Sequence, residues 1–135
     1  MSTGHIKMTF MKLNKLAVYG TLRSGNQDTW KVDGYSLVFP GHRNYPAAMP
    51  DDSQKGIVVE VIDVDEFDIM SYDSYEGVSS GLYERRITKA YNEKDEVDAW
   101  IYTMGPLLFQ NKNVFEFVPK KDWMSKECLK LRNSI

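Results

Sequence analysis

The chain has 135 residues, of which 42% are hydrophobic and 27% are charged, and its formal net charge at pH 7 is −2. This length predicts one domain whose core is large enough to fold without disulfides or structural metals. The slightly negative charge argues against nucleic acid or an anionic membrane as a general partner. The single cysteine, Cys128, excludes an internal disulfide and fits a cytoplasmic protein.

The two histidines, His5 and His42, lie far from each other and from Cys128 in the sequence, so we expect no zinc site. We also expect no transmembrane helix and no signal peptide, because the sequence has no apolar run of the required length. Residues 1–12 lack clear periodicity, and Met8 and Met11 are alternative starts. We therefore expect an N-terminal extension over 1–12, either disordered or added to the natural start, and a single domain over 13–135.

The first predicted strand covers residues 15–20 and ends abruptly at a glycine turn. Gly20 lets a ligand approach the main chain, and successive amides of such a turn can bind an anion. The turn therefore predicts a small carboxylate or phosphate site, although a simple tight turn explains it equally well. A nucleotide-binding P-loop is excluded, because Asn26 and Gln27 stand where lysine and a serine or threonine are required.

Further strands are predicted at 35–39, 56–63, 83–91 and 97–104. The polar segment 92–96 should join the last two strands as a hairpin. Loops are marked by Pro40-Gly41, Tyr45-Pro46, Met49-Pro50-Asp51-Asp52 and Gly105-Pro106. These strands predict a sheet that is mainly antiparallel or closes into a small barrel.

Two helices are predicted. The first is capped by Asp63 or Asp65 and runs to about Tyr75, where Gly77 stops it. The second is a C-terminal helix that Asp122 is expected to cap. Its buried face comprises Met124, Cys128 and Leu131, which are spaced at helical intervals, so Cys128 is expected in the core and not as a nucleophile. The fold class is therefore α+β: a mainly antiparallel sheet or small barrel with one or two short helices.

Two acids, Asp73 and Glu76, lie three residues apart at the end of the first helix. The negative helix end, the charge of Asp73 and burial among tyrosines should each favour the protonated form of Glu76. A glutamate with a raised pKa is a good general acid or base near neutral pH. The alternative is that both acids are ordinary solvated surface groups.

Several segments together resemble the gamma-glutamylcyclotransferase-like family, which includes AIG2-like proteins and gamma-glutamylamine cyclotransferases. The most specific pair is the strand and turn Tyr19-Gly20-Thr21-Leu22-Arg23, followed later by Asp73-Ser74-Tyr75-Glu76-Gly77. Further matching segments, in the order of the family, are Pro40-Gly41, Tyr45-Pro46-Ala47, Gly56-Ile57-Val58-Val59-Glu60, Leu82-Tyr83-Glu84-Arg85, Trp100-Ile101-Tyr102 and Val118-Pro119-Lys120-Lys121-Asp122-Trp123. The Lys120-Lys121 pair replaces the usual Ser-Gly and predicts a different pocket rim.

The resemblance implies that Glu76 is the catalytic acid/base of a pocket for a small γ-glutamyl substrate. It also implies a barrel-like fold and a role in substrate binding for Tyr19, Gly20, Thr21, Leu22 and Tyr83, with Arg85 structural. The implied reaction cyclises a γ-glutamyl group to 5-oxoproline, releases an amine or amino acid, and uses no metal or organic cofactor. We expect a monomer or weak dimer.

Other functions are less consistent with the sequence. The same pocket in a catalytically inactive protein would serve as a binding module for a small metabolite. A γ-glutamyl group on a larger carrier is also a conceivable substrate. A hydrolase with a catalytic triad of Ser24, His42 and Asp73 is disfavoured, because the sequence has no nucleophile-elbow motif. A glycosidase that uses Asp73 and Glu76 is also disfavoured, because two acids at one helix end do not lie on opposite sides of a glycosidic bond.

Overall fold

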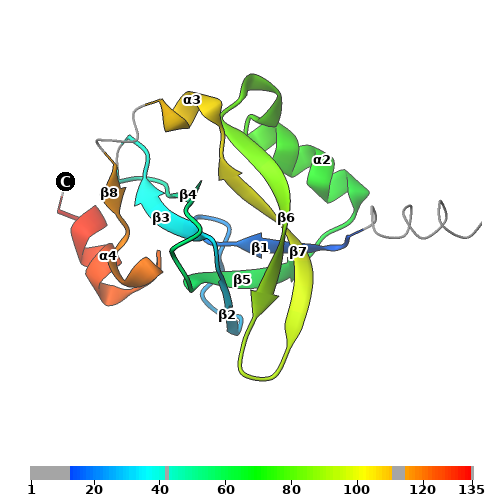
Figure 1. Ribbon diagram of the computed structural model, residues 1–135, viewed down its shortest axis with the longest axis horizontal. Coiled ribbons are helices and arrows are strands. Elements are labelled where there is room, and N and C mark those ends of the chain that lie inside the picture. The colour runs from blue at the N-terminus through cyan, green and yellow to red at the C-terminus, as the bar shows by residue number, and fades with distance from the viewer. Residues whose placement is uncertain (1–12, 42, 111–114, 135) are drawn as a thin grey trace, which may run out of the picture.

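Eight strands and three short α-helices make up the computed structural model (Figure 1), which describes residues 13–41, 43–110 and 115–134. The strands are β1 (Lys15–Val18), β2 (Thr29–Val32), β3 (Tyr35–Phe39), β4 (Ala47–Pro50), β5 (Ile57–Asp63), β6 (Tyr83–Tyr91), β7 (Glu96–Met104) and β8 (Glu116–Phe117). The helices are α2 (Glu66–Tyr75), α3 (Pro106–Phe109) and α4 (Lys126–Arg132), with 3-10 turns η1 (Val78–Ser80) and η3 (Pro119–Lys121).

Five of the strands close into a barrel. They pair in the order β1-β5-β2-β6-β7, and β7 returns to pair with β1. The closing pair is parallel, with Leu16 opposite Trp100, whereas the other pairs within the barrel are antiparallel. The expected α+β fold with a small, mainly antiparallel barrel and flanking short helices is confirmed.

The barrel wall forks along one edge of β7. This edge pairs with β1 at Trp100 and Ile101, and then with β4 at Thr103. Strands β4, β3 and β8 continue outward from the fork as an extension of the sheet. The hydroxyl of Tyr19 lies at the fork, where it accepts a hydrogen bond from the Ala48 amide and donates one to the Tyr102 carbonyl. One side chain thus joins the diverging strands.

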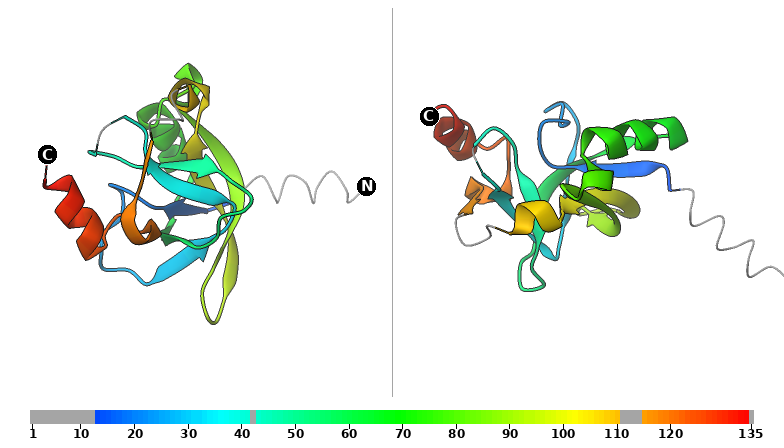
Figure 2. Two further views of the ribbon diagram at one scale, coloured as in Figure 1. Left: turned by 60° about the vertical axis from the view of Figure 1, so that its left-hand side comes forward. Right: turned by 90° about the horizontal axis from the view of Figure 1, so that it is seen from above.

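The core consists of two clusters of buried side chains. The larger cluster includes Ile57, Val59, Ile101, Trp123 and Cys128. The smaller one includes residues of β1, β6 and β7, and half-buried side chains of α2 pack against it. Helices α2 and α4 lie far apart on the barrel: α4 is at the lower left and α2 at the upper right of Figure 1, and the right-hand view of Figure 2 also separates them. The expectation that Cys128 belongs to the core is confirmed, because it is fully buried.

The predicted strands 35–39 and 83–91 have the bounds observed for β3 and β6. The polar hairpin between β6 and β7 is also confirmed. The expected loop at Met49-Pro50 is wrong, because both residues belong to β4. Proline lacks an amide donor but is tolerated at a strand end, and Pro50 is the last residue of this strand. Strands β2 and β8 and helix α3 were not expected from the sequence.

The predicted start and stop of α2 are confirmed. Asp65 caps the helix and forms a reciprocal capping box with Asp68, while Gly77 follows the helix with a left-handed φ of 65°. The prediction that Asp122 caps the terminal helix is wrong. Ser125 caps α4 by accepting a hydrogen bond from the Cys128 amide at 3.0 Å, whereas Asp122 binds Arg23.

Within the described residues, no helix combines the length and apolar character that crossing a bilayer requires. The expected N-terminal extension, residues 1–12, lies outside the part of the chain that the structure describes.

Candidate active site

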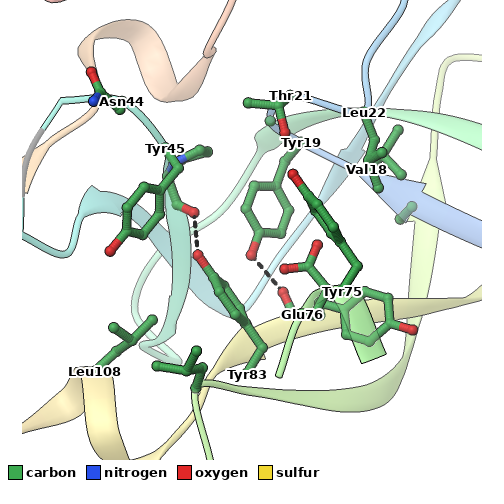
Figure 3. A pocket seen from close by; sticks show the side chains of 15 residues that line it. Val18, Tyr19, Thr21, Leu22, Asn44, Tyr45, Tyr75, Glu76, Tyr83 and Leu108 are labelled. Carbon is green, nitrogen blue, oxygen red and sulfur yellow. Dashed lines mark hydrogen bonds between the residues drawn. The ribbon is translucent and has the colours of Figure 1, made fainter. Parts of the chain in front are cut away.

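A pocket of about 440 Å³ lies beside the fork, where β1 ends and β4 begins (Figure 3). It is lined by Ala17, Val18, Tyr19, Gly20, Thr21, Leu22, Asn44, Tyr45, Pro46, Tyr75, Glu76, Leu82, Tyr83, Tyr102 and Leu108. All six residues that the sequence analysis singled out for catalysis or substrate binding therefore line one cavity. They come from the turn after β1, the end of α2 and the start of β6.

The turn after β1 presents its main chain to this cavity. Gly20 has no side chain, and its carbonyl accepts a hydrogen bond from the Arg23 amide at 3.0 Å. This bond closes the turn without using the Thr21 or Leu22 amide. A Cβ atom on Gly20 would lie 2.7 Å from Cγ of Pro46, which is closer than packed carbons approach. Glycine is thus required here because the turn and the start of β4 come so close together.

A buried acid on β5 holds the far side of this turn. The Glu60 carboxylate accepts hydrogen bonds from Arg23 Nε at 2.9 Å, from the amide and hydroxyl of Ser24 at 2.9 and 3.0 Å, and from the Gly25 amide at 3.1 Å. Arg23 also donates to Asp122 at 2.7 Å. Burial alone would raise the pKa of Glu60, but these donors outweigh it and hold the pKa below its usual value. The sequence analysis assigned Glu60 no role, because the alternation in this strand places it on the more polar face, whereas the structure buries it fully.

Glu76 is the acid of the pocket. It is the residue that caps the C-terminus of α2, where its amide donates to the Tyr72 carbonyl at 2.8 Å. Its carboxyl group points into the cavity, toward Tyr19 (Figure 3). Burial raises the pKa of Glu76 to about 7. Asp73, whose charge was expected to contribute, is instead turned away toward Arg85 and Tyr102.

Two tyrosines form the polar walls of the pocket, and both hydroxyl protons are committed to main-chain carbonyls. Tyr19 donates to Tyr102 at 2.6 Å, and Tyr83 donates to Pro46 at 2.9 Å. Burial raises the pKa of each tyrosine well above its usual value, so both hydroxyls are neutral near pH 7. These side chains therefore shape the pocket and leave Glu76 as its acid that titrates near neutrality.

The expectation that Arg85 is structural agrees with its contacts. Its guanidinium pairs with the Asp73 carboxylate at 2.9 Å and lies over the ring of Trp100, 4.1 Å from the centroid. Arg85 does not line the pocket.

The pocket residues that sequence reasoning did not assign to the site include Asn44, Tyr45, Tyr75, Tyr102 and Leu108. Tyr45, Tyr75 and Tyr102 lie within the segments that resemble the family, and this resemblance was the signal that could have identified them.

The contacts of Ser24 and Asp73 do not support the hydrolytic triad that the sequence analysis considered. Ser24 is bound to Glu60 and Asp73 to Arg85, while His42 lies outside the described residues. Across residues 13–41, 43–110 and 115–134, no three histidine, cysteine or acidic side chains are grouped so that they would hold a metal ion.

The fold is thus a closed barrel with a concave pocket that holds a half-buried acid of raised pKa. Residues 16–125 match the family described as gamma-glutamyl cyclotransferase, AIG2-like, and the chain belongs to this family. No curated protein sequence matches the chain.

Solved structures share the fold at low sequence identity. An AIG2-like protein from Mus musculus is 19% identical and superposes with a TM-score of 0.64, over 86% of this chain and 92% of that one. An uncharacterized protein from Homo sapiens is 16% identical, with a TM-score of 0.58 over 90% of this chain and 87% of that one. A protein entitled gamma-glutamyl cyclotransferase is 15% identical, with a TM-score of 0.55 over 90% and 99% of the two chains.

Proposed function

We propose that the protein is a gamma-glutamyl cyclotransferase that converts a γ-glutamyl group into 5-oxoproline and releases an amine or amino acid. The observation that carries this proposal is the placement of the Glu76 carboxyl group in a pocket whose opposite wall is the turn of Gly20, Thr21 and Leu22. Family membership supports the reaction class.

Substrate binding in this proposal depends on the main chain. The α-carboxylate of the glutamyl group accepts hydrogen bonds from the amides of the turn, two of which are not used in closing it. The walls formed by Tyr19 and Tyr83 then confine the glutamyl chain in a folded shape. Because the attack is intramolecular, holding this near-attack shape supplies much of the rate enhancement.

Glu76 carries the proton transfers. Its carboxylate takes a proton from the α-ammonium group, and the freed amine attacks the γ-carbonyl carbon. The carboxyl group then returns this proton to the departing nitrogen as its bond to that carbon breaks. The second proton lost by the attacking nitrogen, as it becomes the lactam N–H, follows to the departing amine, which leaves as an ammonium ion. A pKa of about 7 suits both steps, because each protonation state is well populated near neutral pH.

The test is to incubate the protein with a panel of γ-glutamyl amino acids and γ-glutamyl amines and to measure 5-oxoproline by mass spectrometry. The panel is repeated with Glu76→Gln and with a matched control, Glu84→Gln, whose exposed carboxylate pairs with Arg86 outside the pocket. We expect product from the unaltered protein and the control. Removing the acid/base should slow turnover by about 10²-fold or more.

A turnover rate for Glu76→Gln within a few-fold of the unaltered protein would overturn the role of Glu76. Absence of product from every substrate would favour the binding module or a larger γ-glutamyl carrier.

We further propose a small-molecule partner, a monomer or weak dimer, and a cytoplasmic location that is compatible with the single cysteine. Sedimentation analysis measures the oligomeric state directly.

A further inference from the structure

Helix α2 carries the acid of the pocket but is held to the barrel by little apolar contact. None of its ten residues is fully buried. Phe67, Met70 and Tyr75 are exposed, whereas Ile69 and Tyr72 are half-buried against the smaller core cluster. Packing alone therefore secures the helix weakly, since burial of apolar surface is the main source of such stabilisation.

A polar cluster supplies the missing attachment at the C-terminal turn of the helix. Asp73 Oδ1 accepts hydrogen bonds from Arg85 Nε at 2.9 Å and from the Tyr102 hydroxyl at 2.6 Å. Asp73 Oδ2 accepts a third from Arg85 Nη2 at 3.2 Å. Arg85 in turn lies over the ring of Trp100. One carboxylate thus ties α2 to both β6 and β7 through a charged, two-point contact, which is the stronger kind of hydrogen bond.

We propose that Asp73 is a positioning residue: it fastens the C-terminal turn of α2 to the barrel and thereby keeps the Glu76 carboxyl group inside the pocket. The two acids are three residues apart, and the Glu76 amide donates to the Tyr72 carbonyl, so the helical backbone links them rigidly. Tyr102 extends the link, because its carbonyl accepts the hydrogen bond of Tyr19 on the pocket wall.

Loosening this attachment should admit water to Glu76 and lower its raised pKa toward the usual value. Among the described residues, the ionisable side chains that line the pocket with Glu76 are Tyr19, Tyr45, Tyr75, Tyr83 and Tyr102. Burial raises the pKa of Tyr19, Tyr83 and Tyr102, so these three stay neutral while Glu76 titrates. The hydroxyl of Tyr102 connects this lining to Asp73, whose charge is paired with that of Arg85.

The experiment measures the pKa of Glu76 by carbon-detected NMR titration of its carboxyl group. Replacing Asp73 alone would leave an unpaired arginine, whose charge would itself lower the pKa. The informative variant is therefore the double substitution Asp73→Ala with Arg85→Gln, which removes the acceptor of all three hydrogen bonds and leaves the net charge unchanged. The matched control is Lys89→Gln with Asp98→Asn, an exposed pair on the same two strands.

We expect the pKa of Glu76 to fall by about one unit or more in the double variant and to stay unchanged in the control. A folded double variant that keeps the pKa of the unaltered protein would overturn the proposal. If the double variant does not fold, Tyr102→Phe decides the question. It removes one hydrogen bond without changing any charge, so a fall in the pKa supports positioning and an unchanged or higher pKa contradicts it.

This inference rests on the proposed function of Glu76, but the two fail in different ways. The titration needs no turnover, so it reports on positioning even if no substrate is cyclised. Where turnover is observed, the acid limb of the pH–rate profile should move to lower pH in the double variant by the same amount as the NMR pKa. A purely structural role for Asp73 would lower the melting temperature without moving either value.

Discussion

Arg23 Nε lies 2.9 Å from Oε2 of Glu60, and the two side chains are 4% and 0% exposed. This pair joins the turn after β1 to the middle of β5. The turn provides one wall of the pocket, so a charged contact outside the cavity determines the shape of the cavity itself.

Glu60→Gln should destabilise the fold by about 3 kcal/mol, because Arg23 keeps only Asp122 as a counter-ion and a neutral amide replaces the buried carboxylate that accepts four hydrogen bonds. Glu84→Gln, which breaks an exposed pair with Arg86, should cost under about 1 kcal/mol. Urea denaturation of both variants measures the difference. Equal losses of unfolding free energy in the two variants would contradict a special contribution from the buried pair.

Glu76→Gln should make the fold more stable at pH 8 than the unaltered protein, and this advantage should disappear near pH 4. The folded pKa of Glu76 is about 7, above the usual value of 4.5, so the folded state binds the proton more tightly. Glu76 therefore lowers stability progressively as pH rises from 4.5 to 7, by about 1.4 kcal/mol for each unit of pKa difference. Thermal unfolding at a series of pH values measures the effect, and a stability difference that is independent of pH would refute it.

Gly20→Ala should destabilise the protein by about 1–3 kcal/mol and weaken ligand binding, because the added methyl group collides with Pro46 and pushes the turn away from β4. Gly41→Ala is the control, since a Cβ atom there meets nothing within 4 Å. Melting temperatures and ligand titrations of both variants check this prediction. If Gly20→Ala is as stable as the control and binds as well, close approach is not what requires glycine.

Cys128 should resist thiol reagents in the folded protein and react once the protein is unfolded. The side chain is fully buried, and burial raises the pKa of the thiol, so little reactive thiolate is available. Mass spectrometry after alkylation, with and without denaturant, counts the modified thiols. Rapid labelling under native conditions would mean that α4 separates readily from the barrel.

Strands β1, β3, β5, β6 and β7 could be predicted from the sequence, whereas β2, β4 and β8 could not. The short strand β1 was found because it is an uninterrupted apolar run before a glycine. The strands β6 and β7 each have nine residues and a polar hairpin between them, so their pairing is encoded locally. By contrast, β4 has four residues and ends in Pro50, and its position is set by pairing with Tyr35 and its neighbours on β3. Strands this short depend on distant partners, which a local pattern does not reveal.

The sequence predicted several residues that line the pocket, but it did not predict the contacts that hold those residues in place. Glu76, Gly20 and Tyr83 lie in motifs with a local chemical signature, and all three line the pocket. The partners of Arg23 are Glu60 and Asp122, which lie 37 and 99 residues away in the chain. Asp122 was predicted to cap a helix, but its carboxylate accepts from the Met124 amide, before α4 begins, and from Arg23, which is distant in the sequence.

The fork in β7 separates two kinds of change that the protein can tolerate. Glu76 and the turn after β1 are attached to the closed barrel, whereas Asn44, Tyr45 and Pro46 precede β4 on the other branch. Substitutions at Asn44 or Tyr45 can therefore change the shape of one wall of the pocket without touching the elements that carry Glu76. The two walls of one cavity can thus be varied separately.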